Sequence, residues 1–128
     1  MAQYADIIAI DAPSEAASGG RVDFTIRVKN TYSAPIGMKV EATLEYGVPP
    51  WPSAIIPVDW ANVDSQATWP FSGYFYMPGQ KVTIHAKSFW YGADGQWYAD
   101  DEMIKTVDLT SAGPPSISDF RIADFVKV

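Results

Sequence analysis

The sequence predicts an all-β domain in which two antiparallel sheets pack face to face. Apolar and polar residues alternate with a period of two along several short segments, which is the pattern of strands with one buried face. Ten prolines and nine glycines, mostly gathered between those segments, indicate frequent turns. Since no segment carries a sustained apolar stripe at helical spacing, we expect six or seven short strands arranged as a sandwich.

The alternation is clearest in residues 22–30 and 38–46, which a turn-forming segment separates. In both, the apolar positions fall on one face and the charged or hydroxylated positions on the other. We therefore expect two half-buried strands. Their predicted inward residues are Val22, Phe24, Ile26, Val28, Met38, Val40, Ala42, Leu44 and Tyr46.

Three later strands are expected at residues 69–77, 81–91 and 97–109. The first contains Pro70, which a strand tolerates only at a sheet edge or at its start. The second and third form an antiparallel hairpin closed by the Gly-Ala-Asp-Gly turn at 92–95. The predicted inward residues of these strands are Trp69, Phe71, Phe75, Met77, Val82, Ile84, Ala86, Trp90, Met103, Val107 and Leu109.

Two segments are less regular. Residues 4–10 form a first strand, which precedes a loop at 11–20. The stretch at 47–66 contains four prolines, which interrupt any alternation. We expect this stretch to cross between the sheets, with one short edge strand around residues 54–56.

Two motifs carry a resemblance to a known family. Residues 7–30 contain a strand, an "AP…SGG" turn and a V-x-F-x-I-x-V-x-N strand, and residues 75–84 read F-x-M-P-G-x-x-V-T-I. These motifs resemble immunoglobulin-like modules of bacterial adhesion proteins and phage virions. The resemblance implies an antiparallel two-sheet immunoglobulin-like sandwich of about seven strands with a C-terminal strand or arm. It implies no activity, because its motifs belong to a fold.

The composition changes after residue 110, so we divide the chain into a sandwich at 1–110 and a tail at 111–128. The tail begins with a Pro/Gly linker, and residues 117–128 form a further apolar segment, here called the C-terminal arm. The arm pairs either with an open edge of its own domain or with a neighbouring molecule, and the two-proline hinge favours the neighbour. Its predicted contact residues are Phe120, Ile122, Phe125 and Val126.

Charge and composition argue against several classes of function. The formal net charge is −6 and the nine basic residues are scattered, which argues against a nucleic-acid-binding surface. The absence of cysteine removes disulfides, thiolate nucleophiles and cysteine-type zinc sites. No apolar window is long enough for a membrane span. The N-terminal residues lack the features of a signal peptide, which indicates either a cloned mature end or another route to the protein's final location.

The titratable residues give no catalytic constellation. His85, the one histidine, falls on the polar face of its strand, where a solvated side chain is expected. The run from Asp100 to Glu102 is expected to be a solvated edge charge, because consecutive strand residues point to opposite faces and cannot converge on one ion. Phosphate-binding loops and hydrolase or metalloprotease motifs are absent from the sequence. We therefore expect no enzyme, no cofactor and no metal.

The hairpin at residues 89–98 is unusually aromatic. Because neighbouring rings leave opposite faces of a strand, half of them are expected to close the end of the core and the rest, with Phe89, to form a surface patch. The predicted partner-binding residues of the hairpin are Phe89, Tyr91, Asp94, Gln96, Trp97 and Tyr98.

Two functions remain open. The first is a structural module of a virion or a surface array, a decoration or tail-associated protein that contacts other protein subunits at the virion or extracellular surface. The second is a carbohydrate-binding or cell-surface adhesion module that binds glycans. The second requires coplanar outward rings accompanied by polar groups such as Gln96 and Asp94.

Overall fold

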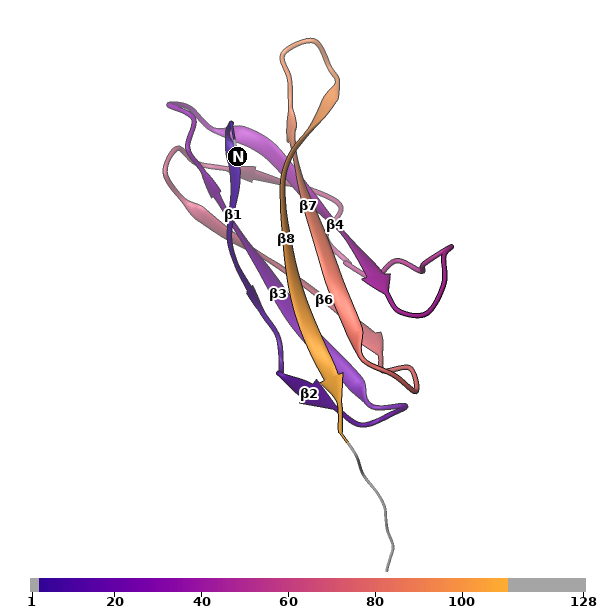
Figure 1. Cartoon of the computed structure of the whole chain (residues 1–128). Coiled ribbons are helices and arrows are strands. Elements are labelled where there is room, and N and C mark those ends of the chain that lie inside the picture. Colours follow the sequence, from indigo (N-terminus) through magenta and orange to yellow (C-terminus); the bar gives the residue numbers. More distant parts are fainter. Residues whose placement is uncertain (1–2, 111–128) are drawn as a thin grey trace, which may run out of the picture.

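The computed structural model describes residues 3–110, in which two β-sheets pack face to face (Figure 1). The predicted all-β two-sheet fold is confirmed, and these residues contain no helix. The strands are β1 (Ala5–Asp11), β2 (Glu15–Ala16), β3 (Arg21–Asn30), β4 (Ile36–Glu45), β5 (Ala61–Val63), β6 (Thr68–Tyr76), β7 (Val82–Tyr91) and β8 (Trp97–Leu109).

The first sheet has the order β1-β3-β6 and the second the order β2-β8-β7-β4-β5. Every pairing is antiparallel except that of β2 with β8, which is parallel, so the second sheet is mixed. This short parallel pair lies inside the segment expected to be a loop. Pro70 is on β6, an edge strand of its sheet, as a strand proline requires.

The core lies between the sheets and is built from the residues that the alternation placed inward. Its largest fully buried apolar side chains are Phe71, Ile26, Met38, Ile84, Val22, Val28, Val63, Val82 and Val107. The predicted inward residues that are only partly buried against the core are Tyr46, Trp90, Met103 and Leu109. Trp69 lies opposite Val28 and projects from the same face of the sheet. Nevertheless 39% of its surface is exposed, because β6 is an edge strand with no neighbour on its outer side there.

The proline-rich stretch does bridge the two sheets, but the expected edge strand at 54–56 is wrong. Ser53 makes an isolated bridge to Thr43 of β4, and Ile55 makes one to Tyr74 of β6. The regular pairing occurs later, at β5, where Ala61 lies opposite Met38. Prolines remove the N–H donors that a continuous strand would need, so the stretch pairs at single points.

The outer edge of β1 is bound by side chains of β8, which belongs to the other sheet. The backbone N–H groups of Gln3, Tyr4 and Ala5 donate to the carboxylate of Asp100 over 2.6, 2.8 and 2.7 Å. The N–H of Ile7 donates to Asp101 over 3.0 Å. These carboxylates take the place of a neighbouring strand and join the two sheets along one edge.

A β-bulge allows two consecutive aspartates to serve the same edge. Lys87 pairs with Glu102 and Phe89 with Ala99, so Asp100 and Asp101 together oppose Ser88 alone. The buried Ser88 hydroxyl donates to the carbonyl of Ala5 over 2.6 Å and accepts from the N–H of Asp101 over 3.0 Å.

The prediction of a solvated acidic edge is therefore wrong for Asp100 and Asp101. Strict alternation does not hold at the bulge, and both carboxylates are engaged with β1. The arrangement has an electrostatic cost at Asp6, where burial, together with the nearby charges of Asp101 and Asp100, raises the pKa of the side chain.

We expect Asp100→Ala to lower the free energy of unfolding by about 1–3 kcal/mol, because it leaves backbone N–H groups without their acceptor. Amide hydrogen exchange at Ala5 should rise in the same variant. Urea denaturation and exchange measured by NMR would test this. Asp108→Ala, at an exposed position on the same strand, is the control, and equal effects of the two substitutions would contradict the proposed role.

We expect Gly73→Ala to destabilise the fold by about 1–3 kcal/mol through overpacking. A Cβ at Gly73 would lie 2.7 Å from the Ile55 carbonyl oxygen and 2.7 Å from Phe24 Cζ. Gly79→Ala is the matched control, because its Cβ would meet only the Ser18 hydroxyl at 4.0 Å. Thermal unfolding of both variants gives the comparison, and an unchanged midpoint for Gly73→Ala would refute the packing argument.

Candidate functional site

The β7–β8 hairpin projects beyond the rest of its sheet (Figure 1). β4 pairs with β7 only as far as Met38 and Trp90, whereas β7 and β8 remain paired through Tyr91 and Trp97. The turn is closed by the N–H of Gly92 donating to the carbonyl of Gln96 over 2.8 Å. Since one end of the hairpin has no strand beside β7, its rings are accessible from both faces.

One face carries a row of four rings, here called the aromatic row: Tyr32, Tyr4, Trp90 and Tyr98. Successive ring centroids are separated by 4.8, 4.9 and 4.7 Å, and the Trp90–Tyr98 pair is stacked. Tyr4 reaches this row because Asp100 and Ser88 hold the start of β1 against β8. Such pairs stabilise one another beyond the area that they bury.

Tyr32 is placed by a buried asparagine. The side-chain amide of Asn30 donates to the carbonyls of Ala34 and Val63 over 2.9 and 2.8 Å, and its oxygen accepts from the N–H of Tyr32 over 2.8 Å. These bonds fix the loop between β3 and β4, so the ring of Tyr32 comes to lie against Tyr4.

The opposite face carries the aromatic cup, formed by Trp60, Tyr91 and Trp97 around a cavity of about 290 Å³. Trp60 is 56% and Tyr91 46% exposed. Gly37 permits their approach, because a Cβ there would lie 3.2 Å from the Tyr91 Cβ and 3.6 Å from the Trp60 ring. The Lys39 ammonium lies 4.9 Å from the Trp97 ring centroid, within range of a cation–π interaction.

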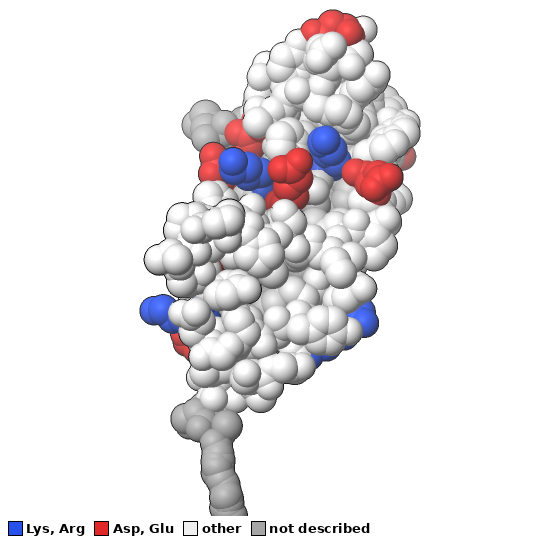
Figure 2. Space-filling model, turned by 90° about the vertical axis from the view of Figure 1, so that its right-hand side faces the viewer, with Lys and Arg blue, Asp and Glu red and all other residues white. Residues whose placement is uncertain are grey.

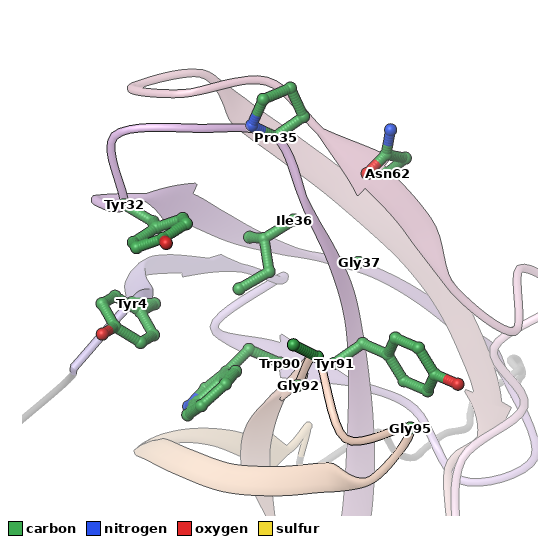
Figure 3. Close-up of a pocket in the computed structure, with 11 residues that line it drawn as sticks. Tyr4, Tyr32, Pro35, Ile36, Gly37, Asn62, Trp90, Tyr91, Gly92 and Gly95 are labelled. Carbon is green, nitrogen blue, oxygen red and sulfur yellow. The ribbon is translucent and has the colours of Figure 1, made fainter.

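An open groove of about 640 Å³ runs beside the hairpin, here called the hairpin groove. Figure 3 shows Tyr4, Tyr32 and Trp90 along one side, Ile36 between the walls, and Tyr91 pointing the other way. The lining is completed by the turn of the hairpin together with Pro35, Gly37, Asn62 and Tyr91. The groove is therefore mostly apolar and aromatic.

The tip of the hairpin is held by a local polar contact. The Tyr98 hydroxyl and the Gln96 N–H both donate to the carboxylate of Asp94. The bond from Tyr98 lowers the pKa of Asp94, and the same bond raises the pKa of Tyr98. Asp94 therefore stays charged at the tip, with its oxygens committed to the hairpin itself.

The structure divides the predicted site residues into two groups. Phe89, Tyr91 and Trp97 share the cup face, where the Lys39 ammonium also lies 5.2 Å from the Phe89 ring centroid. Tyr98 lies in the aromatic row, and Asp94 and Gln96 form the tip. The predicted contact residues of the arm, Phe120, Ile122, Phe125 and Val126, lie outside the described residues.

Sequence reasoning missed four residues of this region: Tyr4, Tyr32, Lys39 and Trp60. Each comes from a segment distant from the hairpin in sequence. The one weak sequence signal was a tryptophan, Trp60, in the proline-rich stretch, where a buried strand is not expected. Nothing local could have placed Tyr4 beside Trp90.

His85 is not the freely solvated side chain that its position predicts. Its Nδ1 lies 2.7 Å from a Glu45 oxygen and its Nε2 lies 2.6 Å from a Glu102 oxygen, with 26% of the side chain exposed. The hydrogen bonds to Glu45 and Glu102 raise the pKa of His85. Both ring nitrogens are occupied, so no nitrogen remains for a substrate.

Within residues 3–110 no three metal-ligating side chains are grouped as a metal site would require, and no helix there could cross a membrane. Figure 2 shows a face on which an acidic tip stands above an uncharged surface and a belt of mixed charges. The chemically distinctive feature of the described chain is therefore its aromatic hairpin end.

No family model and no curated protein sequence matches this chain. Its fold is similar to part of the alkylpurine DNA glycosylase AlkC of Pseudomonas fluorescens, at 11% identity and a TM-score of 0.58, covering 82% of this chain and 30% of that one. It is also similar to the putative ApaA protein of Bordetella pertussis, at 11% identity and a TM-score of 0.57, covering 87% and 99% of the two chains.

A third similar structure is a cycloisomaltooligosaccharide glucanotransferase of Paenibacillus sp., at 20% identity and a TM-score of 0.53. The match covers 87% of this chain but only 15% of that enzyme. At these identities the likenesses establish the fold alone, because one fold carries many functions.

We expect the stability of the protein to fall as the pH rises through the raised pKa of His85. The folded state favours imidazolium, so the contribution of the two carboxylates is complete below the ordinary imidazole pKa of about 6.5 and is lost above the folded-state pKa. Urea denaturation between pH 5.5 and 9 would show this slope. His85→Gln should remove it, and an identical slope in the variant would assign the dependence to other groups.

Proposed function

We propose that this protein is a non-enzymatic structural module with an immunoglobulin-like fold, which docks onto another protein subunit through its aromatic cup. The observation that carries the proposal is the convergence of Trp60, Tyr91 and Trp97 on a solvent-open cavity at a projecting pole. Exposed tryptophan and tyrosine rings backed by a rigid sheet are the usual anchors of protein interfaces. Lys39, whose ammonium lies over the Trp97 ring, adds a charge that can select an acidic or hydrogen-bonding partner group.

The geometry favours a protein partner over a glycan. The planes of Tyr91 and Trp97 are inclined at 60°, so the two rings do not form the flat platform on which a sugar ring stacks. Asp94, the acidic residue nearest the tip, is already bonded to Tyr98 and Gln96. A cup of inclined rings suits a bulky side chain inserted from a partner.

We propose further that the module belongs to a virion, as a decoration or tail-associated protein, or to a surface array. Support comes from the shape of the domain: the aromatic end and the end of β8 lie at opposite poles (Figure 1). A module with two separated poles suits a repeating assembly. The occupied nitrogens of His85 support a role without catalysis.

Photo-cross-linking tests the proposal directly. With benzoylphenylalanine in place of Tyr91, we expect irradiation of the native assembly to give a discrete protein adduct, which Trp97→Ala should reduce by about tenfold or more if the anchor is an interface hot spot. Tyr76 is the matched control position, since it is 61% exposed and ends β6 at the other pole. Glycan binding that Trp97→Ala abolishes, without any protein adduct at Tyr91, would refute the proposal in favour of carbohydrate recognition.

A further inference from the structure

We infer that the hairpin groove receives the C-terminal arm of a second copy of this chain, so that copies associate head to tail. This inference rests on the proposed function, in that it names one partner of the hairpin end. The surface differs from the aromatic cup in that its wall is the aromatic row, on the opposite face of the hairpin, although Tyr91 borders both. The occupant is residues 117–128, and its principal anchors are Phe120 and Ile122.

The two poles of the domain set the direction of the contact. β8 begins at the hairpin with Trp97 and ends at Leu109, at the far pole, one residue before the described part of the chain ends (Figure 1). A strand of 13 residues at a rise of about 3.3 Å per residue separates these points by about 40 Å. The groove and the end of β8 therefore lie at opposite ends of the molecule.

This separation opposes a contact between the arm and the groove of its own chain. Even a fully extended chain places Ile117 at most about 28 Å and Phe120 at most about 38 Å from Leu109, because each residue spans at most about 3.5 Å. The arm could therefore reach its own groove only if every residue of the linker were fully extended along the domain. In a second copy stacked on the same axis, the far pole of one molecule faces the hairpin of the next, and the linker needs to cross only the gap between them.

The chemistry of the arm matches that of the groove. Phe120 and Ile122 are two positions apart, so in an extended segment they project from the same side about 7 Å from each other. The groove offers Tyr4, Tyr32 and Ile36 as apolar walls, and its volume of about 640 Å³ lies in the range that holds a few inserted groups. The peptide and the groove can therefore exclude water together.

Electrostatics favour the arm over the body as the contacting element. The arm carries Asp119, Arg121, Asp124 and Lys127, two charges of each sign, so the net charge of −6 resides on the rest of the chain. Two bodies placed face to face repel each other, whereas a neutral arm approaches an acidic body without that cost. An arm-to-groove contact joins different surfaces, so it generates rings or filaments rather than a closed twofold dimer.

Light scattering and sedimentation of full-length variants test the inference. The full chain should increase in mass with concentration. Phe120→Asp with Ile122→Asp should raise the dissociation constant by about tenfold or more, as should Tyr32→Glu, which puts a charge into the groove. Pro35→Glu, at an exposed loop position lining the groove, repeats the second test if Tyr32→Glu lowers the thermal midpoint. Ser116→Asp and Tyr76→Glu are the controls.

Mixing the two defective chains gives the decisive result. The arm variant keeps an intact groove and the groove variant keeps an intact arm, so an equimolar mixture should form one-to-one pairs and nothing larger. A full chain that stays monomeric, an arm variant that associates like the wild type, or a mixture that does not pair would each overturn the inference. Trp97→Ala should associate normally, and cross-linking from benzoylphenylalanine at Trp60, which lines the cup and not the groove, should persist in the arm variant, so a failure here is distinguishable from a failure of the cup proposal.

Discussion

The joining of the two sheets along one edge depends on two carboxylates that replace a missing strand. β1 lies at the edge of the three-stranded sheet, and its free N–H groups are bound by Asp100 and Asp101 of β8. Charged acceptors make stronger bonds than neutral ones, which offsets the cost of placing the Asp100 and Asp101 carboxylates near Asp6. An edge bound in this way offers no template for aggregation.

The same contact creates the candidate site. By holding the start of β1 against β8, it sets Tyr4 edge-on to Trp90, and Trp90 stacks on Tyr98. A hairpin that would otherwise project alone is thus braced on one face. Its other face carries the aromatic cup, where Gly37 leaves room for Tyr91 to approach Trp60. Bracing and exposure together give rigid rings that solvent reaches, which are the properties of an interface anchor.

The hairpin end offers two faces of different character. The cup is small and three-sided, with the Lys39 ammonium beside its Trp97 ring, whereas the groove is larger and lined mostly by apolar and aromatic residues. We propose that the cup holds an unlike subunit and that the groove holds the arm of a like one. In that proposal each copy makes one head-to-tail contact with the next copy and one anchoring contact with a larger particle.

The sequence by itself determined the class of the fold and the inward face of most strands, because period-two alternation is a local consequence of strand geometry and burial. It also located the aromatic hairpin, since ring positions and the Gly-Ala-Asp-Gly turn are local. Only the tertiary structure decided that Asp100 and Asp101 face one edge, since a bulge breaks the alternation that sequence reasoning assumes. It alone brought Tyr4, Tyr32 and Trp60 to the hairpin, because contacts between distant segments depend on how the two sheets pack rather than on any local pattern.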